Sequence, residues 1–463
     1  MRKTIIAFLT IASIACTSLN AQAAINYLPG VRQEMSSSSF WSKRQEDRSK
    51  VLLDSKQINR LNKKIMKTPA TNMFALKRQP VSLNGIELSN QLYEAAKNEV
   101  SNFIDEKYDE YGNITGADYY EDMVNNCINP DATENQYIRY AIVVNRANLL
   151  AFPTEKAILD DPGDNDFDNL FLSSVPVNEP VIIRSVSADG KYYHVYSDYC
   201  PGWISVEDVA ICANKKEWLD AWDFPEKKLL VVYGSRISTE DSRTNPDVAR
   251  RRLSMGTRLE LVSGKKRGSM VTNRSTYNNY IVYLPVRKED GHYEKKAALI
   301  SQHKRVNEGY LELTKENISK VAFGMLGDAY GWGGMLGSED CSGYVRNVYR
   351  CFGLELARNT TWQSAMPVKK YDMTDFTIKK KEAVLDELPL GSILFFPGHE
   401  MLYLGKVDGR YYVIDSVSSI MKPGTNQVQR VRSVIINPLD IKRRNGELWI
   451  ESMNTAIVLW NKI

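Results

Sequence analysis

Two glycine-containing stretches decide how the end of this 463-residue chain folds: YGWGG at Tyr330–Gly334 and DCSG at Asp340–Gly343. The glycines let the backbone turn sharply and pass close to a ligand. A helix beginning at Cys341 is indicated by apolar residues at helical spacing, namely Val345, Val348, Tyr349 and Phe352. Cys341 therefore opens a helix, where the positive end of the helix dipole favours a thiolate over a thiol.

A thiolate nucleophile needs a base, and the chain has only four histidines. His399 opens the predicted strand Met401–Leu404, and Asp415 follows the predicted strand Tyr411–Ile414. A cysteine at a helix start, a histidine on a facing strand and a carboxylate that orients the imidazole give a papain-like arrangement. The other histidines (His194, His292 and His303) lack the spacing of zinc ligands, so no metal and no cofactor is predicted.

With these motifs, residues 314–463 resemble the NlpC-type cysteine peptidases, which are papain-like murein endopeptidases. The resemblance implies that Cys341 is the nucleophile and His399 the general base. The third position of the family is usually His, Asn or Gln, and Asp415 stands there in this chain. The family typically cleaves the bond between γ-D-glutamate and a diamino acid in peptidoglycan stem peptides. By the same resemblance, four residues line the substrate subsites: Tyr330, Trp332, Asp340 and Ser342.

The N-terminus has the features of a secretory signal peptide over residues 1–23. Arg2 and Lys3 precede the apolar run Ile5–Ala15, and Ala21–Ala23 supplies small residues for cleavage. We therefore expect export to the periplasm or cell envelope, with lipidation at Cys16 as a weaker alternative. No later segment has 18 uncharged apolar residues, so no transmembrane segment is predicted in the mature chain.

Cleavage after Ala23 would leave five cysteines, and an odd number in an exported protein leaves at least one thiol unpaired. Cys341 is the thiol that we expect to be free. Pairing among the other four stays open, with a disulfide between Cys200 and Cys212 as one possibility: Cys127, Cys200, Cys212 and Cys351.

The distribution of helical, strand and turn signals along the sequence predicts a multidomain chain. A mostly helical segment (24–136) comes first. Two β-rich blocks of short strands and turn signals follow (137–213 and 226–305), and we interpret them as small SH3-like barrels. The last part (314–463) is an α+β peptidase domain. This layout is similar to a branch of the family with a helical stabilising segment and two bacterial SH3-like domains. In that branch a barrel lip can cap the active site and bind the free amine of L-Ala, for which Asp168 and Tyr199 are the candidates here.

The sequence thus favours an exported cysteine endopeptidase that hydrolyses the γ-D-glutamyl–diamino acid bond, with freed muropeptides carrying N-terminal L-Ala as substrates. The oligomeric state and the diamino acid stay open. Two alternatives also stay open: an amidase or acyltransferase with the same Cys–His site, and a non-catalytic cell-wall-binding protein. A net charge of +4 is too small to indicate a nucleic-acid partner.

Overall fold

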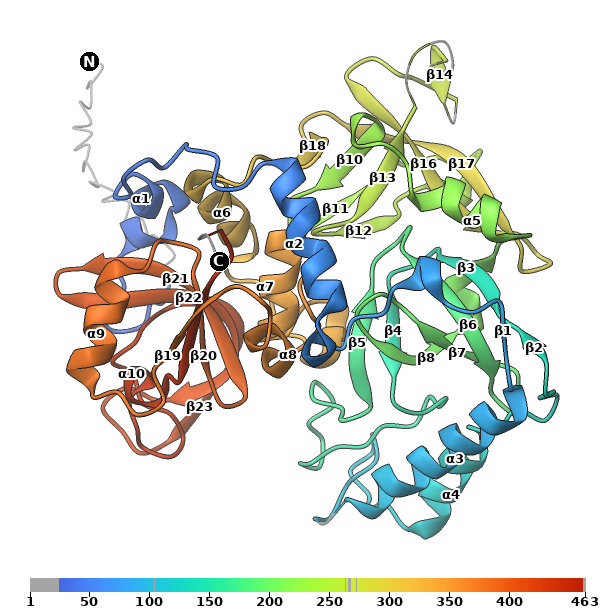
Figure 1. Cartoon of the computed structure of the whole chain (residues 1–463), viewed down its shortest axis with the longest axis horizontal. Helices are drawn as coiled ribbons and strands as arrows, with labels where there is room; N and C mark the ends of the chain where they lie inside the picture. The colour runs from blue at the N-terminus through green and yellow to red at the C-terminus, as the bar shows by residue number, and fades with distance from the viewer. Residues whose placement is uncertain (1–24, 104, 263, 265–267, 272, 461–463) are drawn as a thin grey trace, which may run out of the picture.

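The computed structural model describes residues 25–103, 105–262, 264, 268–271 and 273–460. The predicted signal peptide with Cys16 lies outside the described residues, as does Ile104 within the segment 24–136 that the sequence predicts to be mostly helical. Figure 1 shows three units: a C-terminal domain drawn in orange and red, a β-rich unit of residues 139–211 in green and teal (β-domain 1), and a β-rich unit of residues 229–308 in yellow-green (β-domain 2). No helix in the described part of the chain is long and apolar enough to cross a membrane.

The C-terminal domain (residues 314–460) is built on a six-stranded antiparallel sheet in the order β19-β24-β20-β21-β22-β23. Its strands are β19 (Lys369–Asp372), β20 (Ile393–Phe396), β21 (His399–Val407), β22 (Arg410–Met421), β23 (Val428–Pro438) and β24 (Thr455–Val458). Its helices are α6 (Lys315–Ala322), α7 (Cys341–Arg350), α8 (Thr360–Ser364), α9 (Ile378–Glu387) and α10 (Trp449–Ser452). Helices α6 and α7 pack on one face of the sheet, and α9 and α10 on the other.

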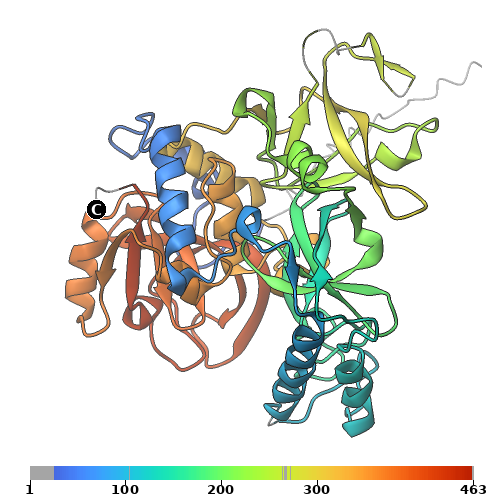
Figure 2. The same ribbon diagram turned by 45° about the vertical axis from the view of Figure 1, so that its right-hand side comes forward.

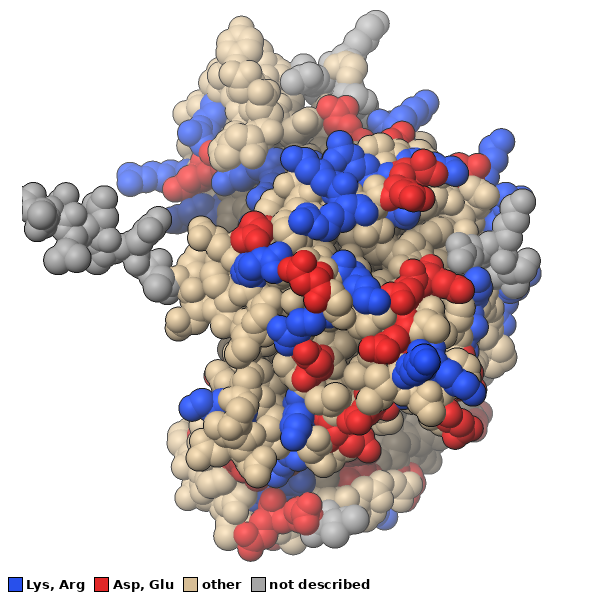
Figure 3. Space-filling view, turned by 90° about the vertical axis from the view of Figure 1, so that its left-hand side faces the viewer, with Lys and Arg blue, Asp and Glu red and all other residues tan. Residues whose placement is uncertain are grey.

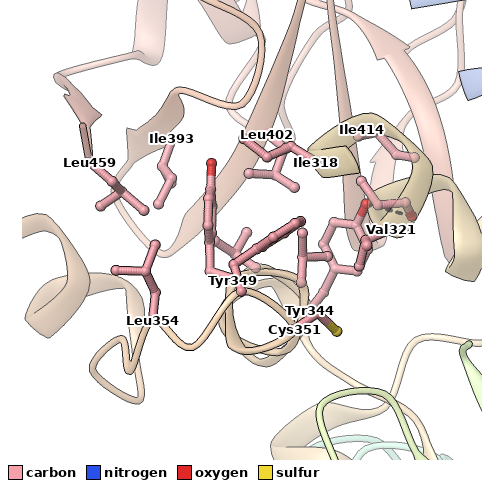
Figure 4. Close-up of a cluster of buried hydrophobic side chains, with 14 of the residues drawn as sticks. Ile318, Val321, Tyr344, Tyr349, Cys351, Leu354, Ile393, Leu402, Ile414 and Leu459 are labelled. Atoms are coloured by element: carbon pink, nitrogen blue, oxygen red, sulfur yellow. Dashed lines mark hydrogen bonds between the residues drawn. The ribbon is translucent and has the colours of Figure 1, made fainter. Parts of the chain in front are cut away.

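Alternate residues of each strand supply the two cores of this domain, as the two-residue period of a strand requires. Ile393, Leu402 and Ile414 point toward α6 and α7, whereas Leu394 and Met401 point toward α9 and α10. Figure 4 shows the first core, where side chains of α7 meet those of the sheet. Each fully buried aliphatic side chain contributes about 1.5–3 kcal/mol, so this face of α7 fixes the position of the helix.

β-domain 1 is a seven-stranded antiparallel sheet in the order β5-β4-β8-β7-β6-β3-β9. Its strands are β3 (Arg139–Val143), β4 (Ala147–Leu150), β5 (Phe171–Val175), β6 (Pro180–Val186), β7 (Tyr192–Tyr196), β8 (Pro201–Ser205) and β9 (Val209–Ile211). A short pair, β1 (Ser82–Leu83) with β2 (Gln136–Tyr137), precedes it. All seven strands lie within residues 137–213, the first block that the sequence predicts to be β-rich.

β-domain 2 follows helix α5 (Lys215–Trp222) and has its own apolar core. Its main sheet has the order β17-β16-β13-β10-β18. The strands are β10 (Leu229–Val232), β11 (Arg236–Ser238), β12 (Arg252–Ser254), β13 (Arg258–Leu261), β14 (Met270–Val271), β15 (Arg274–Ser275), β16 (Asn279–Arg287), β17 (Tyr293–Ser301) and β18 (Val306–Glu308). Strands β10 to β17 lie within residues 226–305, the second block that the sequence predicts to be β-rich, although charged residues interrupt the first half of β17.

The N-terminal segment, expected to form one helical unit over 24–136, is instead divided between two units. Helices α1 (Ser38–Ser42) and α2 (Ser55–Lys67) bury Trp41 and Ile65 in the core of the C-terminal domain. Helices α3 (Gly85–Ser101) and α4 (Ala117–Asn125) pack instead on β-domain 1 through Ala96 and Met123. Figure 2 shows α3 and α4 at the end of β-domain 1 that lies away from α2. The pair α1 and α2 and the pair α3 and α4 cover different apolar surfaces, so the four helices do not share one core.

A buried cluster of charges joins the three units beneath α7. Glu179, in the turn between β5 and β6, is 3% exposed and pairs with Arg258 of β-domain 2 at 3.0 Å and with Arg350 of α7. Arg258 also reaches Glu355 of the C-terminal domain at 2.6 Å. Burial opposes ionisation of Glu179, but the two guanidinium charges outweigh it and lower the pKa to about 2.

Removing this carboxylate should destabilise the protein strongly. Glu179→Gln leaves two buried guanidinium groups short of a counter-charge, and we expect a loss of about 3–5 kcal/mol in the free energy of unfolding, measured by urea denaturation. Because the pKa of Glu179 is depressed on folding, its contribution is present above the unfolded value near 4.5 and is lost as the pH falls toward 2.

The matched control is Asp220→Asn, which breaks the exposed pair of Asp220 with Lys216 on α5. We expect it to change the stability by less than about 1 kcal/mol, because exposed ion pairs contribute little. On the face seen in Figure 3, charges of both signs are interspersed in this exposed way. Equal effects of the two substitutions would contradict a special role for Glu179.

Candidate active site

Cys341 is the first residue of α7, and its side chain lies where the helix meets the sheet. The residue is 8% exposed. The N–H groups of the first helical turn have no partners within the helix, so they present partial positive charge at this end. The position predicted from the sequence is confirmed, and it can favour a thiolate and stabilise a developing oxyanion.

Asp340 caps α7 and is held in a dense set of polar contacts. Its Oδ1 accepts from the Gly343 N–H at 2.7 Å and from the Ser342 hydroxyl at 3.1 Å. Arg358, whose role the sequence did not reveal, donates to Oδ2 at 2.6 Å. Burial raises the pKa of Asp340, but Arg358 and the hydrogen bonds outweigh it and keep the pKa below its usual value. Asp340 and Ser342, predicted to line the substrate subsites, thus hold the first turn of α7.

His399 and Asp415 meet as predicted. His399 opens β21, Asp415 lies in the adjacent β22, and Nε2 of the imidazole is 2.5 Å from Oδ2 of the carboxylate. The other carboxylate oxygen accepts a hydrogen bond from the amide of Asn437, a fully buried residue of β23. Because Nε2 is occupied by Asp415, Nδ1 is the ring nitrogen left for Cys341. Asp415 orients the imidazole, and Asn437 in turn orients Asp415.

The electrostatics of His399 favour an imidazolium. Burial alone would lower its pKa, but interactions with Asp415 and with the Cys341 thiol outweigh burial and raise the pKa to about 10. Burial raises the pKa of Asp415 in spite of its bond to His399. The rings of Phe396 and Trp449 lie 5.1 and 5.3 Å from the imidazole and restrict its rotation. A cysteine beside such an imidazolium is suited to nucleophilic catalysis.

An aromatic residue from β-domain 1 covers the glycine-rich loop. Phe167 stacks on Trp332, with ring centroids 4.6 Å apart, and lies parallel to Tyr330 at 6.3 Å. Tyr330 is buried and Trp332 half-buried, and the indole N–H of Trp332 is buried without a partner in the described structure. The predicted aromatic subsite residues therefore lie together, beneath a side chain that the sequence did not single out.

The segment that carries Phe167, residues 160–170, is joined to β23 by ion pairs. Arg430 contacts Asp161 at 3.0 Å, and Arg432 pairs with Asp164 and contacts Asp166 at 3.6 Å. We call residues 160–170 the covering loop, because these contacts hold it across the aromatic pair Tyr330 and Trp332.

Glycines in the segment 331–334 are required by a close approach to β5. Gly333 has φ +54° and Gly334 φ +88°, a region that side chains disfavour. A Cβ on Gly333 would lie 2.2 Å from the carbonyl oxygen of Phe171, and one on Gly334 would lie 2.5 Å from the hydroxyl of Ser174. Arg146 of β-domain 1 donates to the carbonyls of Gly334 and Ser338 at 2.8 and 2.7 Å, which fixes the same loop.

Asp168 and Tyr199, the two candidates for binding a substrate amine, make hydrogen bonds inside β-domain 1. The Asp168 carboxylate accepts the N–H groups of Ile158 and Leu170 at 3.0 and 2.9 Å, which shapes the base of the covering loop. Tyr199 is 1% exposed, and its hydroxyl donates to the Ser174 carbonyl at 2.6 Å. Both N–H groups donate to the same oxygen of Asp168, Oδ1, and the contact of these two residues with a substrate amine stays a prediction.

All five described cysteines are unpaired and buried. Cys200 lies in the core of β-domain 1, whereas Cys212 packs with Trp218, so the considered disulfide between them is absent. Burial raises the pKa of Cys200 and Cys351 to about 11 and about 12, which keeps them as thiols. Among the described residues, no group of three or more His, Cys, Asp or Glu side chains is arranged to hold a metal ion.

Replacing Asp415 should lower the pKa of His399. Asp415→Asn keeps the shape but removes the charge that stabilises the imidazolium, so we expect the His399 pKa to fall from about 10 by roughly 1–3 units. With four histidines in the chain, NMR titration can follow this ring. Asp386→Asn, an exposed carboxylate that pairs with Lys406, is the control and should leave the His399 titration unchanged. An unchanged titration in Asp415→Asn would contradict the assigned contact.

Comparisons with known proteins agree with this geometry. The NlpC/P60 family profile matches residues 327–449, and the profile of the SH3 domain of SH3b1 type matches residues 158–205. Dipeptidyl-peptidase 6 of Lysinibacillus sphaericus is 33% identical over 94 residues, which are 20% of this chain and only 30% of that protein. The fold is similar to the structure of an NlpC/P60 endopeptidase from Photobacterium damselae subsp. piscicida, with a TM-score of 0.72 and 17% identity over 91% of this chain and 96% of that chain. The chain therefore carries a C-terminal NlpC/P60 domain, which contains Cys341, His399 and Asp415, preceded by an SH3 domain of the SH3b1 type.

Proposed function

We propose that this chain is a cysteine endopeptidase of the cell wall that cleaves the γ-D-glutamyl–diamino acid bond of peptidoglycan stem peptides. The observation that carries the proposal is the combination of Cys341 at the start of α7 with the His399–Asp415 pair, inside a domain that matches the NlpC/P60 family. The family resemblance supplies the bond and the substrate. We also propose export through the signal peptide, and a second SH3-like unit in β-domain 2, whose core is separate from that of β-domain 1.

The chemistry follows from the three side chains. The Cys341 thiolate attacks the γ-D-glutamyl carbonyl carbon and forms a C–S bond, and the N–H groups at the start of α7 stabilise the oxyanion. His399 then gives its Nδ1 proton to the departing amine of the diamino acid as the C–N bond breaks. Water attacks the resulting thioester with neutral His399 as the base, which breaks the C–S bond, releases the acid and restores the Cys341 thiolate and the His399 imidazolium. Asp415 keeps the imidazole in the required orientation throughout.

Cys341→Ala should abolish cleavage. With L-Ala-γ-D-Glu-diaminopimelate as substrate, we expect the wild type to release diaminopimelate, detected by mass spectrometry, and the variant to fall to background because it has no nucleophile. Cys212→Ala, a buried thiol outside the site, is the control and should remain active.

Two outcomes of this experiment, and one result from a binding assay with sacculi, would contradict the proposal. Wild-type turnover by Cys341→Ala would overturn the mechanism. A product cut at another bond would indicate an amidase or acyltransferase. Binding to sacculi that persists without residues 314–463, with no turnover by the full chain, would indicate a wall-binding protein.

The covering loop supports a preference for small substrates. Phe167 and the ion pairs of Arg430 and Arg432 close the space above Trp332, so we propose that freed stem peptides with an N-terminal L-Ala are better substrates than intact wall.

Releasing the covering loop should weaken this preference. In the double variant Arg430→Gln/Arg432→Gln the loop loses its ion pairs, so we expect the rate ratio of free tripeptide to whole sacculi to fall severalfold. Both rates are measured by quantifying released diaminopimelate. Arg444→Gln, an exposed arginine, is the control. The proposed selection of small substrates by the covering loop would be contradicted by a rate ratio near one in the wild type. It would also be contradicted by the same ratio in the double variant as in the wild type.

A further inference from the structure

A cavity of about 490 Å³ lies where the three units of the protein meet. Its walls come from the turn between β3 and β4 in β-domain 1, from β11, β12 and the turn before β12 in β-domain 2, and from Gly337, which ends the turn that carries Trp332. Among the described residues, no carboxylate lines this cavity, whereas five arginines do: Arg146, Arg236, Arg250, Arg251 and Arg252. A cavity of this size can hold a small ligand, and its lining favours a negatively charged one.

Three of these five arginines already have an acidic partner behind the cavity wall. The pairs are Arg146 with Glu339 at 2.8 Å, Arg250 with Asp241 at 3.4 Å and Arg236 with Asp328 at 3.8 Å. The remaining two, Arg251 and Arg252, form no ion pair with any residue that the structure describes. The cavity therefore has two positive charges that no carboxylate of the chain pairs with.

Arg251 is half-buried at the boundary between the two β-domains, where its guanidinium donates to the carbonyl of Val144 at 3.1 Å. Burial lowers its pKa, although Asp247 and Asp208 act in the opposite direction. Both carboxylates have other partners: Asp247 pairs with Lys296 at 2.7 Å, and Asp208 accepts a hydrogen bond from a side-chain amide at 3.1 Å. Because a partly buried cation without a counter-charge is costly, a bound anion would stabilise this side chain.

Two lining residues also have a hydrogen-bond donor that no protein atom uses. Ser254 is 7% exposed, and its hydroxyl has no partner in the described structure. The Nε–H of Arg146 is buried and likewise has no partner there. Buried polar groups are nearly always hydrogen-bonded in folded proteins. An oxygen acceptor in the cavity would give these donors a partner.

The backbone before β12 is strained at the cavity. Arg250 has φ +52°, a left-handed conformation that side chains other than glycine adopt only at a cost. Consecutive residues of an extended chain point to opposite sides. The left-handed turn instead lets three consecutive arginines, 250–252, line the same cavity.

We propose that this cavity is a binding site for a small dianion, either a phosphate group or a pair of carboxylates. Guanidinium groups recognise both through their fork of N–H donors. Arg251 and Arg252 supply the two unpaired charges, and Ser254 supplies a neutral donor. Because the walls belong to all three units, the bound anion links them and stabilises the folded chain. The site contains none of the proposed catalytic residues, so it does not depend on the proposed function.

Binding is measured on the full chain by isothermal titration calorimetry at constant ionic strength. The probes are two dianions, inorganic phosphate and succinate, with the monoanion acetate for comparison. We expect at least one dianion to bind saturably with a submillimolar Kd and to raise the unfolding temperature, and acetate to bind much more weakly. Binding of phosphate alone would identify a phosphate group as the ligand, and binding of succinate alone would identify a pair of carboxylates.

Three variants assign the binding to this cavity. Arg251→Gln/Arg252→Gln should raise the Kd by about tenfold or more, because it removes two charge-assisted contacts. The matched control is Arg243→Gln/Arg444→Gln, which removes the same charge from exposed arginines outside the cavity and should bind as the wild type does. Ser254→Ala should raise the Kd severalfold without lowering the unfolding temperature of the free protein, because the lost hydroxyl has no protein partner.

Two results would overturn the inference. One is the absence of saturable binding of both dianions to the wild type. The other is an equal loss of binding in the cavity variant and in its matched control, which would indicate general attraction to a positive surface. If the double variant does not fold, Arg252→Gln alone decides, since this exposed side chain forms no ion pair in the described chain. Cys341→Ala should bind the dianion as the wild type does, so this test is independent of the test of catalysis.

Discussion

The charge cluster around Glu179 is the contact on which the arrangement of this protein depends. One carboxylate from β-domain 1 faces a guanidinium group from β-domain 2 and another from α7, and all three side chains are largely or completely buried. Such a cluster tolerates little relative movement, because any displacement leaves a charge unpaired in an apolar surrounding. The position of α7, and with it Cys341, is therefore set by the β-domains as well as by its own sheet.

Helix α7 packs against both its own sheet and the β-domains, because one side of the helix is apolar and the other carries arginines. Tyr344, Val345 and Val348 face the sheet, whereas Arg346 and Arg350 face the β-domains. At the N-terminus of the same helix, Arg358 continues this link by joining Asp340 to Ser173 of β5. Three sets of contacts thus fix the position of Cys341: the charge cluster around Glu179, the capping contacts of Asp340, and the packing of the glycine-rich loop against β5. The NlpC/P60 domain depends on β-domain 1 for the shape of its active site.

The sequence alone was sufficient to predict those site residues that adjoin a recognisable helix or strand pattern in the chain. Cys341 follows a capping aspartate and opens an amphipathic helix, and His399 and Asp415 each adjoin an apolar strand run. Asn437 was missed because Gln429, Arg430 and Arg432 break the alternation of β23, so the strand resembles a polar loop. Arg358 and Phe167 have no local signal at all, since each acquires its role from contacts with other segments of the chain. The backbone partners of Asp168 and Tyr199 could not be foreseen either, because they lie on other turns and strands of β-domain 1.

The packing of α2 on the C-terminal domain has a consequence for how the chain folds during its synthesis. The side chain of Asn62 donates to the carbonyl of Gly353, 291 residues later, and Ile65 lies in a core built mainly by residues beyond 310. At roughly 5–20 residues per second, synthesis delivers that surface on the order of tens of seconds after α2 emerges. During this interval the apolar face of α2 has no native partner. Helices α1 and α2 therefore complete the C-terminal domain. If synthesis stops early, their apolar faces stay uncovered and prone to aggregation.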